Sequence, residues 1–492
     1  MKRDFPLGGW QKQTAILLCA AIVLGSVLRF FRLGSRELSI DESLSWFAAA
    51  APSVSDLLRI QHGVDSGKLA IHELALRGWM HMFGESEGAM RAMSALIGSL
   101  SIGLVFILAL EILAAIPATE TEATETMERP QGRIYLIAAV SALLFAVGLP
   151  AVEIARQARM YSMMQAWILA QVIFMLRARR LGGVANYAGL AIFTGLAVAT
   201  NFTALLVIGA EGLWLIYLFV REARGAEPVR IGTPWRLGAA ILLGVVLLLP
   251  FWNGLENGAV GLERGDFNWI HLPGRWEPFA TFENGLGSWP FPLFALFATV
   301  GGVRMWRTYR EGALLALLWI LLPPIALFAG SYIVTPMLVT RYLISSFVPV
   351  FILTAIGIES IPVEMYRALA LVAIVSLSIL RDSSDLRPGD DRWHRACELA
   401  LAHKGPERRV GACHDYYLVS YYIGAPQRDQ VQVIRVPSHR ADHLDPGVVV
   451  ASPTAGTGQI AELRRTYPEV AMVKNILVMW RTMAPNQIAP GS

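Results

Sequence analysis

The hydrophobic positions of the chain gather into long runs with few charged residues between them. A run of roughly 20 apolar residues is long enough to cross the hydrocarbon core of a bilayer as a helix. Eleven such runs can be read along the chain, and they predict a helix bundle that crosses a membrane about eleven times. The runs cover residues 13–31, 92–116, 134–151, 162–178, 185–200, 202–220, 237–252, 291–306, 312–332, 343–359 and 366–381.

Two polar stretches between the runs are too long for plain connectors. Residues 32–91 form a first outer loop with amphipathic helical patterns at 43–60 and 68–83. An amphipathic helix of this kind typically lies in the plane of the membrane interface. Residues 253–290 form a second such stretch, rich in Trp, Gly and Asn.

From residue 382 onward the composition changes to that of a soluble domain. Strands that alternate with helices predict a small α/β domain there. We therefore expect two domains, a transmembrane domain over residues 1–381 and an α/β domain over 382–492. The expected helices of this second domain cover residues 391–403, 416–423 and 460–466, and its strands cover 409–413, 431–436, 448–451 and 476–481.

The composition agrees with a membrane protein and excludes several other classes. Hydrophobic residues make up 54% of the chain and charged residues only 16%, against about 25% charged residues in an average soluble domain. Such a chain is neither a water-soluble globule nor disordered. The net charge of +4 needs no nucleic-acid partner, because Lys and Arg concentrate on cytoplasmic loops of membrane proteins.

The distribution of basic residues predicts the orientation. With the N-terminus in the cytoplasm, most Lys and Arg residues of the loops fall on the cytoplasmic side, as the positive-inside rule requires. An odd number of spans then places the C-terminal domain outside. The basic residues on the cytoplasmic side are Lys2, Arg3, Lys12, Arg129, Arg133, Arg177, Arg179, Arg180, Arg221, Arg224, Arg230, Arg236, Arg304, Arg307, Arg310 and Arg367.

Two adjacent acids, Asp41 and Glu42, follow the first run directly. Carboxylates beside a membrane are expensive to bury, so an isolated pair is easily left in contact with water. Asp41 is also suited to cap a helix that begins at Glu42 or Ser43. Capping and catalysis are compatible, since a capping carboxylate is rigidly held.

Cationic groups recur at the same predicted side of the membrane. Lys68 and His72 are four residues apart, which places them on one face of a helix, either to hold a phosphate or to reach into water. In the segment from Glu153 to Tyr161, an ion pair of Glu153 with Arg156 and an interfacial Tyr161 leave Arg159 unexplained. Arginine is the preferred partner of phosphate oxygens.

Two further charged positions lie within or beside the apolar runs. Arg341 and Tyr342 lie directly before the tenth run, where a short outer loop leads into it. A charged residue embedded in a membrane indicates a functional role by default. Glu211 lies in the middle of the sixth run, and the sequence suggests no partner for it.

Five short segments together resemble a known family. The chain is similar to the polyprenyl-phosphate-sugar-dependent glycosyltransferases of the GT-C fold. The resemblance is to the bacterial branch related to protein O-mannosyltransferases, aminoarabinose lipid A transferases and rhizobial lipopolysaccharide galacturonosyltransferases. It covers roughly residues 14–380, and its segments are 38–43, 68–84, 90–94, 156–162 and 341–343.

The resemblance implies roles for individual residues. Asp41 matches the acid that acts as catalytic base or orients the acceptor, with Glu42 as its companion. The resemblance assigns the donor phosphate to Lys68, Arg159, Tyr161 and Arg341, and it makes His72, Arg156 and Tyr342 candidates for further substrate contacts. Relatives carry prolines after the residue that Lys68 matches, whereas this chain has Leu69 and Ala70.

The resemblance also implies a reaction, its partners and a location. A polyprenyl-phosphate-linked donor gives its sugar, with inversion, to a hydroxyl of a glycan, glycolipid or protein on the outer side of a bacterial inner membrane. No cofactor is required, although a divalent metal near the acids, assisted by His62, His72 or His271, is compatible with the family. The alternatives are a transporter or flippase for a lipid-linked sugar or solute, and a silent scaffold that binds glycans through its C-terminal domain.

Overall fold

A computed structural model describes most of the 492-residue chain. The described residues are 9–64, 68–114, 128–225, 233–248, 270–385, 389, 391–403, 409–413, 415–424, 431–433, 448–451 and 457–480. Residues 115–127 and most of the second polar stretch, residues 253–269, lie outside them.

The chain divides into two compact units. The first comprises residues 1–33 and 52–387, and the second comprises residues 34–51 and 388–492. This division differs from the expected domains in two respects. Residues 34–51 of the first outer loop group with the C-terminal part of the chain, and the boundary lies after residue 387 and not after residue 381.

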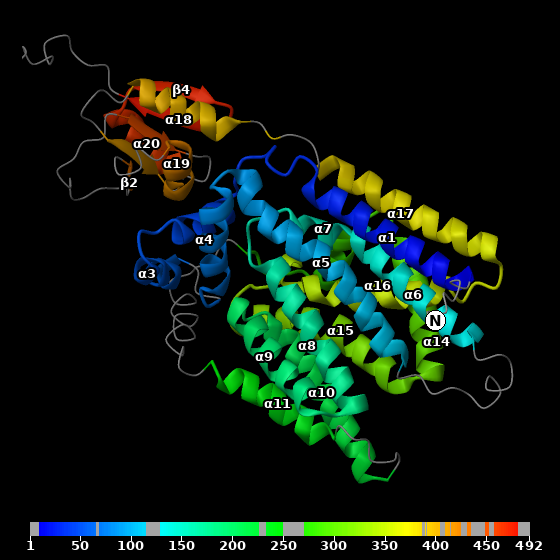
Figure 1. The fold of residues 1–492 in the computed structure, drawn as a ribbon. Coiled ribbons are helices and arrows are strands. Elements are labelled where there is room, and N and C mark those ends of the chain that lie inside the picture. Colours follow the sequence, from blue (N-terminus) through cyan, green and yellow to red (C-terminus); the bar gives the residue numbers. More distant parts are fainter. Residues whose placement is uncertain are drawn as a thin grey trace, which may run out of the picture. The chain divides into compact units, whose positions relative to one another are not determined.

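The first unit is a bundle of apolar helices (Figure 1). Each of the eleven apolar runs falls mainly within a helix. The corresponding helices are α1 (Gly9–Phe30), α5 (Glu87–Ala114), α6 (Glu128–Val147), α8 (Tyr161–Leu181), α9 (Val184–Thr200), α10 (Ala204–Ala223), α11 (Pro234–Val246), α14 (Phe291–Thr308), α15 (Arg310–Ile333), α16 (Phe347–Ile358) and α17 (Glu364–Asp385).

Not all of these helices qualify as membrane spans by length and composition. Among the described residues five do, or seven if two bent pairs each form one span. The first pair joins α6 to α7 (Leu149–Ala155) with a bend of 56°, and the second joins α13 (Glu277–Leu286) to α14 with a bend of 105°. A polytopic helical protein is confirmed, whereas the count of eleven spans stays a prediction.

The first outer loop contains three helices. The helix expected at 68–83 is present as α4 (Ile71–Phe83). The single pattern expected at 43–60 is instead two helices, α2 (Ile40–Ala49) and α3 (Val54–Val64). Pro52 explains the break, because proline lacks a backbone donor and disfavours helical geometry in the residue before it.

Helices α14 and α16 pack against each other at glycines. A Cβ atom on Gly301 would overlap the carbonyl oxygen of Leu353, and one on Gly357 would overlap that of Phe297. Small residues let helix backbones approach closely within membranes. This contact fixes α16 and the 3₁₀ helix η2 (Thr340–Ser346) that precedes it.

The second unit contains one five-stranded sheet in the order β2-β1-β3-β5-β4. Strand β1 pairs in parallel with β2 and β3, whereas β5 pairs antiparallel with β3 and β4. The elements of this unit are α2, α18 (Arg392–His403), β1 (Val410–Cys413), α19 (Tyr416–Tyr422), β2 (Val431–Val433), β3 (Val448–Ala451), α20 (Thr457–Thr466), β4 (Glu469–Val473) and β5 (Ile476–Trp480).

Helices cover both faces of this sheet. Leu477 and Met479 of β5 pack against α20, while Trp480, the next residue along, contacts His403 of α18. Since successive side chains of a strand point to opposite faces, α18 and α20 lie on opposite sides of the sheet.

Strand β4 is the one element of this unit that the sequence analysis missed. Its side chains are mostly exposed because it forms the sheet edge, so it lacks an apolar signal. Its hairpin to β5 turns through Lys474 and Asn475, with φ of 55° at Lys474. A turn with positive φ usually carries Asn-Gly or Asp-Gly, and this one does not.

Candidate functional site

Four charged or polar side chains from distant parts of the first unit meet in its interior. We call Lys68, His72, Glu73 and Arg159 the buried charge cluster; none of them is more than 5% exposed. The Lys68 Nζ atom lies 2.5 Å from Glu73 Oε1, and His72 Nδ1 lies 3.1 Å from the same oxygen. Lys68 Nζ also lies 3.6 Å from the sulfur of Met160, which follows Arg159 in the chain.

Backbone contacts hold both segments of the buried charge cluster in place. The Leu69 amide donates to the carbonyl oxygen of Ala199 at the end of α9, at 2.9 Å. The Ser94 hydroxyl of α5 donates to the carbonyl oxygen of Arg159 at 3.3 Å. Arg159 lies in the link between α7 and α8, so four helices position the cluster.

Burial and neighbouring charges set the protonation of Glu73. Burial alone raises the pKa of a carboxyl group, but Lys68 and His72 outweigh this effect and hold the pKa of Glu73 below its usual range. Glu73 is therefore charged and forms a buried ion pair with Lys68.

His72 is held in its neutral form. Burial lowers the pKa of His72 from its ordinary value of 6.5, Glu73 opposes this shift, and Lys68 and Arg159 add to the lowering. Its Nε2 atom is buried and has no hydrogen-bond partner among the described residues. With His72 neutral, the charged members of the buried charge cluster are two cations, Lys68 and Arg159, and one carboxylate, Glu73.

Glu73 is a member of the buried charge cluster that was not predicted from the sequence. The pairing of Lys68 with His72 was expected from their spacing of four, but Lys68 precedes the first turn of α4, where this spacing does not hold. An acid in the first turn of an amphipathic helix, five residues after a lysine, was the available signal.

Lys68→Met is expected to destabilise the protein by about 3–5 kcal/mol, because it leaves the carboxylate of Glu73 buried without its cation. The double variant Lys68→Met/Glu73→Gln is expected to recover most of this loss. Thermal unfolding of the purified protein in detergent measures both. A single variant as stable as wild type would contradict a buried ion pair.

The pH dependence of stability tests the state of His72. As the pH falls below 6.5, an unfolded chain takes up a proton at His72 while the native protein, with its lowered pKa, does not. The free energy of unfolding of the wild type is therefore expected to fall from pH 6.5 down to the native pKa. In His72→Gln this protonation is absent, so the free energy of unfolding is expected to fall less over the same pH range. Glu73 lowers the stability only below pH 4.5, the ordinary pKa of its carboxyl group. Unfolding midpoints that respond to pH equally in both proteins would contradict a neutral His72.

The other predicted phosphate ligands lie on elements beside the buried charge cluster. Helix η2, which carries Arg341 and Tyr342, contacts both α7 and α8, the helices that flank Arg159. The Arg341 guanidinium lies 5.9 Å from the ring centre of Tyr342. Tyr161 is 2% exposed and packs in the apolar core at the start of α8.

Arg156 has contacts that stabilise the end of a helix. Its Nη1 atom donates to the carbonyl oxygens of Leu28, Arg29 and Phe31 at 2.9, 3.2 and 2.8 Å. The last carbonyls of a helix lack partners within the helix, and a cation there also interacts favourably with the helix dipole. These contacts fit a structural role for Arg156 at the end of α1.

The prediction that Asp41 caps a helix is wrong. Ser39 is the N-cap of α2, and Glu42 completes a capping box by accepting hydrogen bonds from the backbone and hydroxyl of Ser39 at 2.9 and 3.1 Å. Serine at the cap with glutamate three residues later satisfies two backbone donors. Asp41 is therefore in the first turn of α2 and is half-buried there.

Helix α2 is held by the C-terminal part of its own unit. Trp46 meets the ring of Tyr421 edge-on at 5.0 Å, and Phe47 contacts Tyr417 at 5.0 Å. The Leu38 amide, just before α2, donates to the Tyr422 hydroxyl at 2.6 Å. The helix that carries Asp41 thus packs on α19.

Two remaining expectations concern an acid and a metal. Glu211 has a partner that the sequence did not suggest, since Gln171 Nε2 of α8 donates to its Oε2 atom at 2.7 Å. Among the described residues, no three His, Cys, Asp or Glu side chains are grouped to hold a metal ion. His271 contacts Glu277 at 2.7 Å on the surface.

Comparisons of the sequence find no family model and no curated protein that matches. Solved structures do match. ArnT from Cupriavidus metallidurans bound to undecaprenyl phosphate has a TM-score of 0.61 at 14% identity and covers 95% of this chain and 98% of its own. The archaeal oligosaccharyltransferase AglB from Archaeoglobus fulgidus, in complex with an inhibitory peptide and a dolichol-phosphate, has a TM-score of 0.57 at 12% identity and covers 94% and 71%.

These neighbours are GT-C glycosyltransferases, so the resemblance read from the sequence is confirmed at the level of the fold. A further structure of the Archaeoglobus fulgidus enzyme, in complex with Zn and sulfate, has a TM-score of 0.51 at 12% identity and covers 92% of this chain and 68% of its own. The likeness extends over almost the whole chain, including both units.

Proposed function

We propose that this chain is an inverting glycosyltransferase that moves a sugar from a polyprenyl-phosphate donor to an acceptor hydroxyl. The fold supports this, because its neighbours include one protein bound to undecaprenyl phosphate and one bound to a dolichol-phosphate. A lipid-linked donor also fits the absence of a nucleotide-binding motif from the sequence.

The observation that carries the proposal is that two buried cations, Lys68 and Arg159, meet in the buried charge cluster. Lys68 is already paired with Glu73, so its proposed role is to position α4 against the segment of Arg159. We assign the donor phosphate to Arg159 together with Arg341 on the adjacent η2. Cations fixed before the reaction stabilise the negative charge that grows on the departing lipid phosphate.

Asp41 is the proposed general base. The acceptor hydroxyl attacks the anomeric carbon, its proton passes to the Asp41 carboxylate, and the bond to the phosphate oxygen breaks as polyprenyl phosphate leaves. Glu42 is occupied by its capping box, which favours Asp41 for this step.

The placement in the cell follows from the same proposal. The protein crosses a bacterial inner membrane several times, with its N-terminus in the cytoplasm and its C-terminal domain outside. It therefore receives the donor on the outer leaflet. The acceptor is a glycan, glycolipid or protein hydroxyl at that surface.

The test uses purified protein in detergent with polyprenyl-phosphate-linked sugars and an extract of envelope glycolipids. Release of polyprenyl phosphate together with a glycosylated acceptor supports the transferase. Movement of the intact donor across vesicle membranes without any release would favour the alternative, a transporter or flippase. Adding EDTA or Mg²⁺ to the same assay measures whether a metal contributes.

A further inference from the structure

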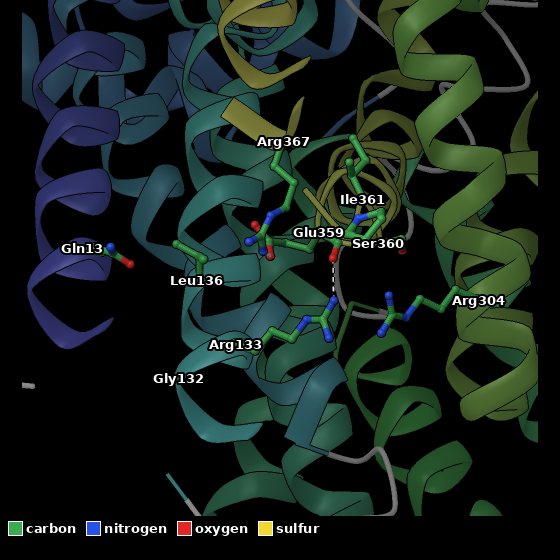
Figure 2. Close-up of a pocket in the computed structure, with 10 residues that line it drawn as sticks. Gln13, Gly132, Arg133, Leu136, Arg304, Glu359, Ser360, Ile361 and Arg367 are labelled. Atoms are coloured by element: carbon green, nitrogen blue, oxygen red, sulfur yellow. Dashed lines mark hydrogen bonds and ion pairs between the residues drawn. The ribbon is translucent and has the colours of Figure 1, made fainter. Parts of the chain in front are cut away.

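A large cavity opens among the helix ends of the first unit, with a volume of about 860 Å³ (Figure 2). It is lined by the start of α1, the start of α6, the end of α14 and the link from α16 to α17. The residues that carry charge around it are Arg133, Arg304, Arg367 and Glu359.

Three arginines from three different helices and a single carboxylate, that of Glu359, line this cavity. Arg367 Nη1 donates to Glu359 Oε2 at 2.8 Å, and Arg133 Nη2 donates to the Glu359 carbonyl oxygen at 2.5 Å. The Arg304 guanidinium, from α14, extends toward the same space and has no hydrogen bond or ion pair within the described part of the chain (Figure 2). The charged lining of the cavity therefore comprises three arginines and one glutamate.

The arrangement around Glu359 leaves donors available to a ligand. Glu359 is 5% exposed, so its carboxylate is committed to holding Arg367 in place. The Arg367 Nε atom is buried and has no hydrogen-bond partner among the described residues. A buried donor without a partner is costly, and an anion in the cavity would satisfy it.

This cavity is separate from the buried charge cluster. Helix α16 begins directly after η2, which carries Arg341, and ends directly before Glu359. With 12 residues and a rise of about 1.5 Å per residue, α16 is about 18 Å long. The cavity therefore lies at the opposite end of helices whose other ends approach Arg159 and Arg341, and the positive-inside pattern predicts that this end faces the cytoplasm.

We propose that this cavity binds a phosphate-bearing anion independently of sugar transfer. A guanidinium group matches the geometry of phosphate and binds two of its oxygens at once. Arginines that only set the topology would not need to converge on one cavity. Basic pockets between membrane helices at the cytoplasmic side are the kind of site that binds anionic lipid headgroups.

The same phosphate chemistry has two sources. Exposed apolar side chains on both helices beside the cavity, Val303 and Trp306 of α14 and Met365 and Leu369 of α17, give acyl chains a surface to lie on. A soluble phosphate reaches the cavity from water instead.

The experiment compares Arg304→Gln with Arg307→Gln. Both lie on α14 and lose one positive charge, but Arg307 is exposed and does not line the cavity. Native mass spectrometry of the full chain measures retention of phosphatidylglycerol against phosphatidylcholine, and a parallel arm measures thermal stabilisation by inorganic phosphate or pyrophosphate. Arg304→Gln is expected to weaken binding about fivefold, the contribution of one arginine beside an anionic headgroup, and Arg307→Gln to leave it unchanged.

Each outcome decides the proposal. Selective retention of phosphatidylglycerol that depends on Arg304 supports a lipid headgroup, and stabilisation by inorganic phosphate that depends on Arg304 supports a soluble ligand. Equal losses in the two variants would overturn the site, because they would indicate general surface charge. No preference for either anion in the wild type would overturn it as well.

Discussion

Asp41→Asn is expected to lower the rate of sugar transfer by roughly 10²- to 10⁴-fold, the usual contribution of a positioned general base. Asparagine has nearly the same shape as aspartate but does not accept the proton of the acceptor hydroxyl. Asp41 is in the first turn of α2, where a negative charge contributes only about 0.3–1 kcal/mol to helix stability. The variant is therefore expected to fold, and the loss concerns turnover.

Glu42→Gln is the matched control for Asp41→Asn. It removes one negative charge from the adjacent position, while glutamine also completes a capping box with Ser39. The control is expected to keep most of its transfer activity. Release of polyprenyl phosphate under single-turnover conditions compares the two variants. A loss in Glu42→Gln as large as that in Asp41→Asn would remove the distinction between the acids, and wild-type turnover in Asp41→Asn would exclude it as the base.

Much of the fold was predictable from the sequence because apolar runs and helix signals are local. The helices of the bundle and the alternation of strands and helices after residue 390 follow from such patterns. What escaped prediction has no apolar pattern of its own or depends on partners distant in the chain. Strand β4 has mostly exposed side chains and is defined by its pairing with β5.

The buried charge cluster shows the same limit at the level of residues. Arg159 and Lys68 were both expected near a phosphate, but only the fold shows that Glu73 neutralises Lys68 and that His72 is neutral. The sequence places Glu73 on a helix and cannot show that its side chain turns inward. The packing of α2 on α19 joins segments more than 350 residues apart, for which a single sequence has no signal.

The packing of α2 on α19 predicts the second large loss of sugar transfer. Ending the chain after Arg387 is expected to reduce transfer to the level of Asp41→Asn, because it removes the tyrosines that hold Trp46 and Phe47. Trp46 is 1% exposed in the complete chain, so the truncation also uncovers a large apolar side chain. A truncated protein with wild-type transfer would instead make residues 388–492 accessory and would exclude the silent-scaffold alternative.

A point variant distinguishes this effect from a failure to fold. Tyr421→Ala removes the edge-on contact to Trp46, and aromatic pairs of this kind contribute about 0.5–1.5 kcal/mol beyond the area that they bury. It is expected to lower transfer roughly two- to thirteenfold, in proportion to that energy. Met472→Ala, on the exposed edge strand β4, changes the same unit without touching α2 and is expected to have no effect.

Combining the truncation with Asp41→Asn shows how residues 388–492 act. If they serve only to hold Asp41, the two changes remove the same contribution, and the double variant is no slower than either alone. Independent contributions multiply, so a double variant slower than both singles indicates a second role, such as a contact with the acceptor. The comparison needs only initial rates of polyprenyl phosphate release from four proteins at equal concentration. Non-additivity would then tie the C-terminal domain to the chemistry through the single helix that carries the base.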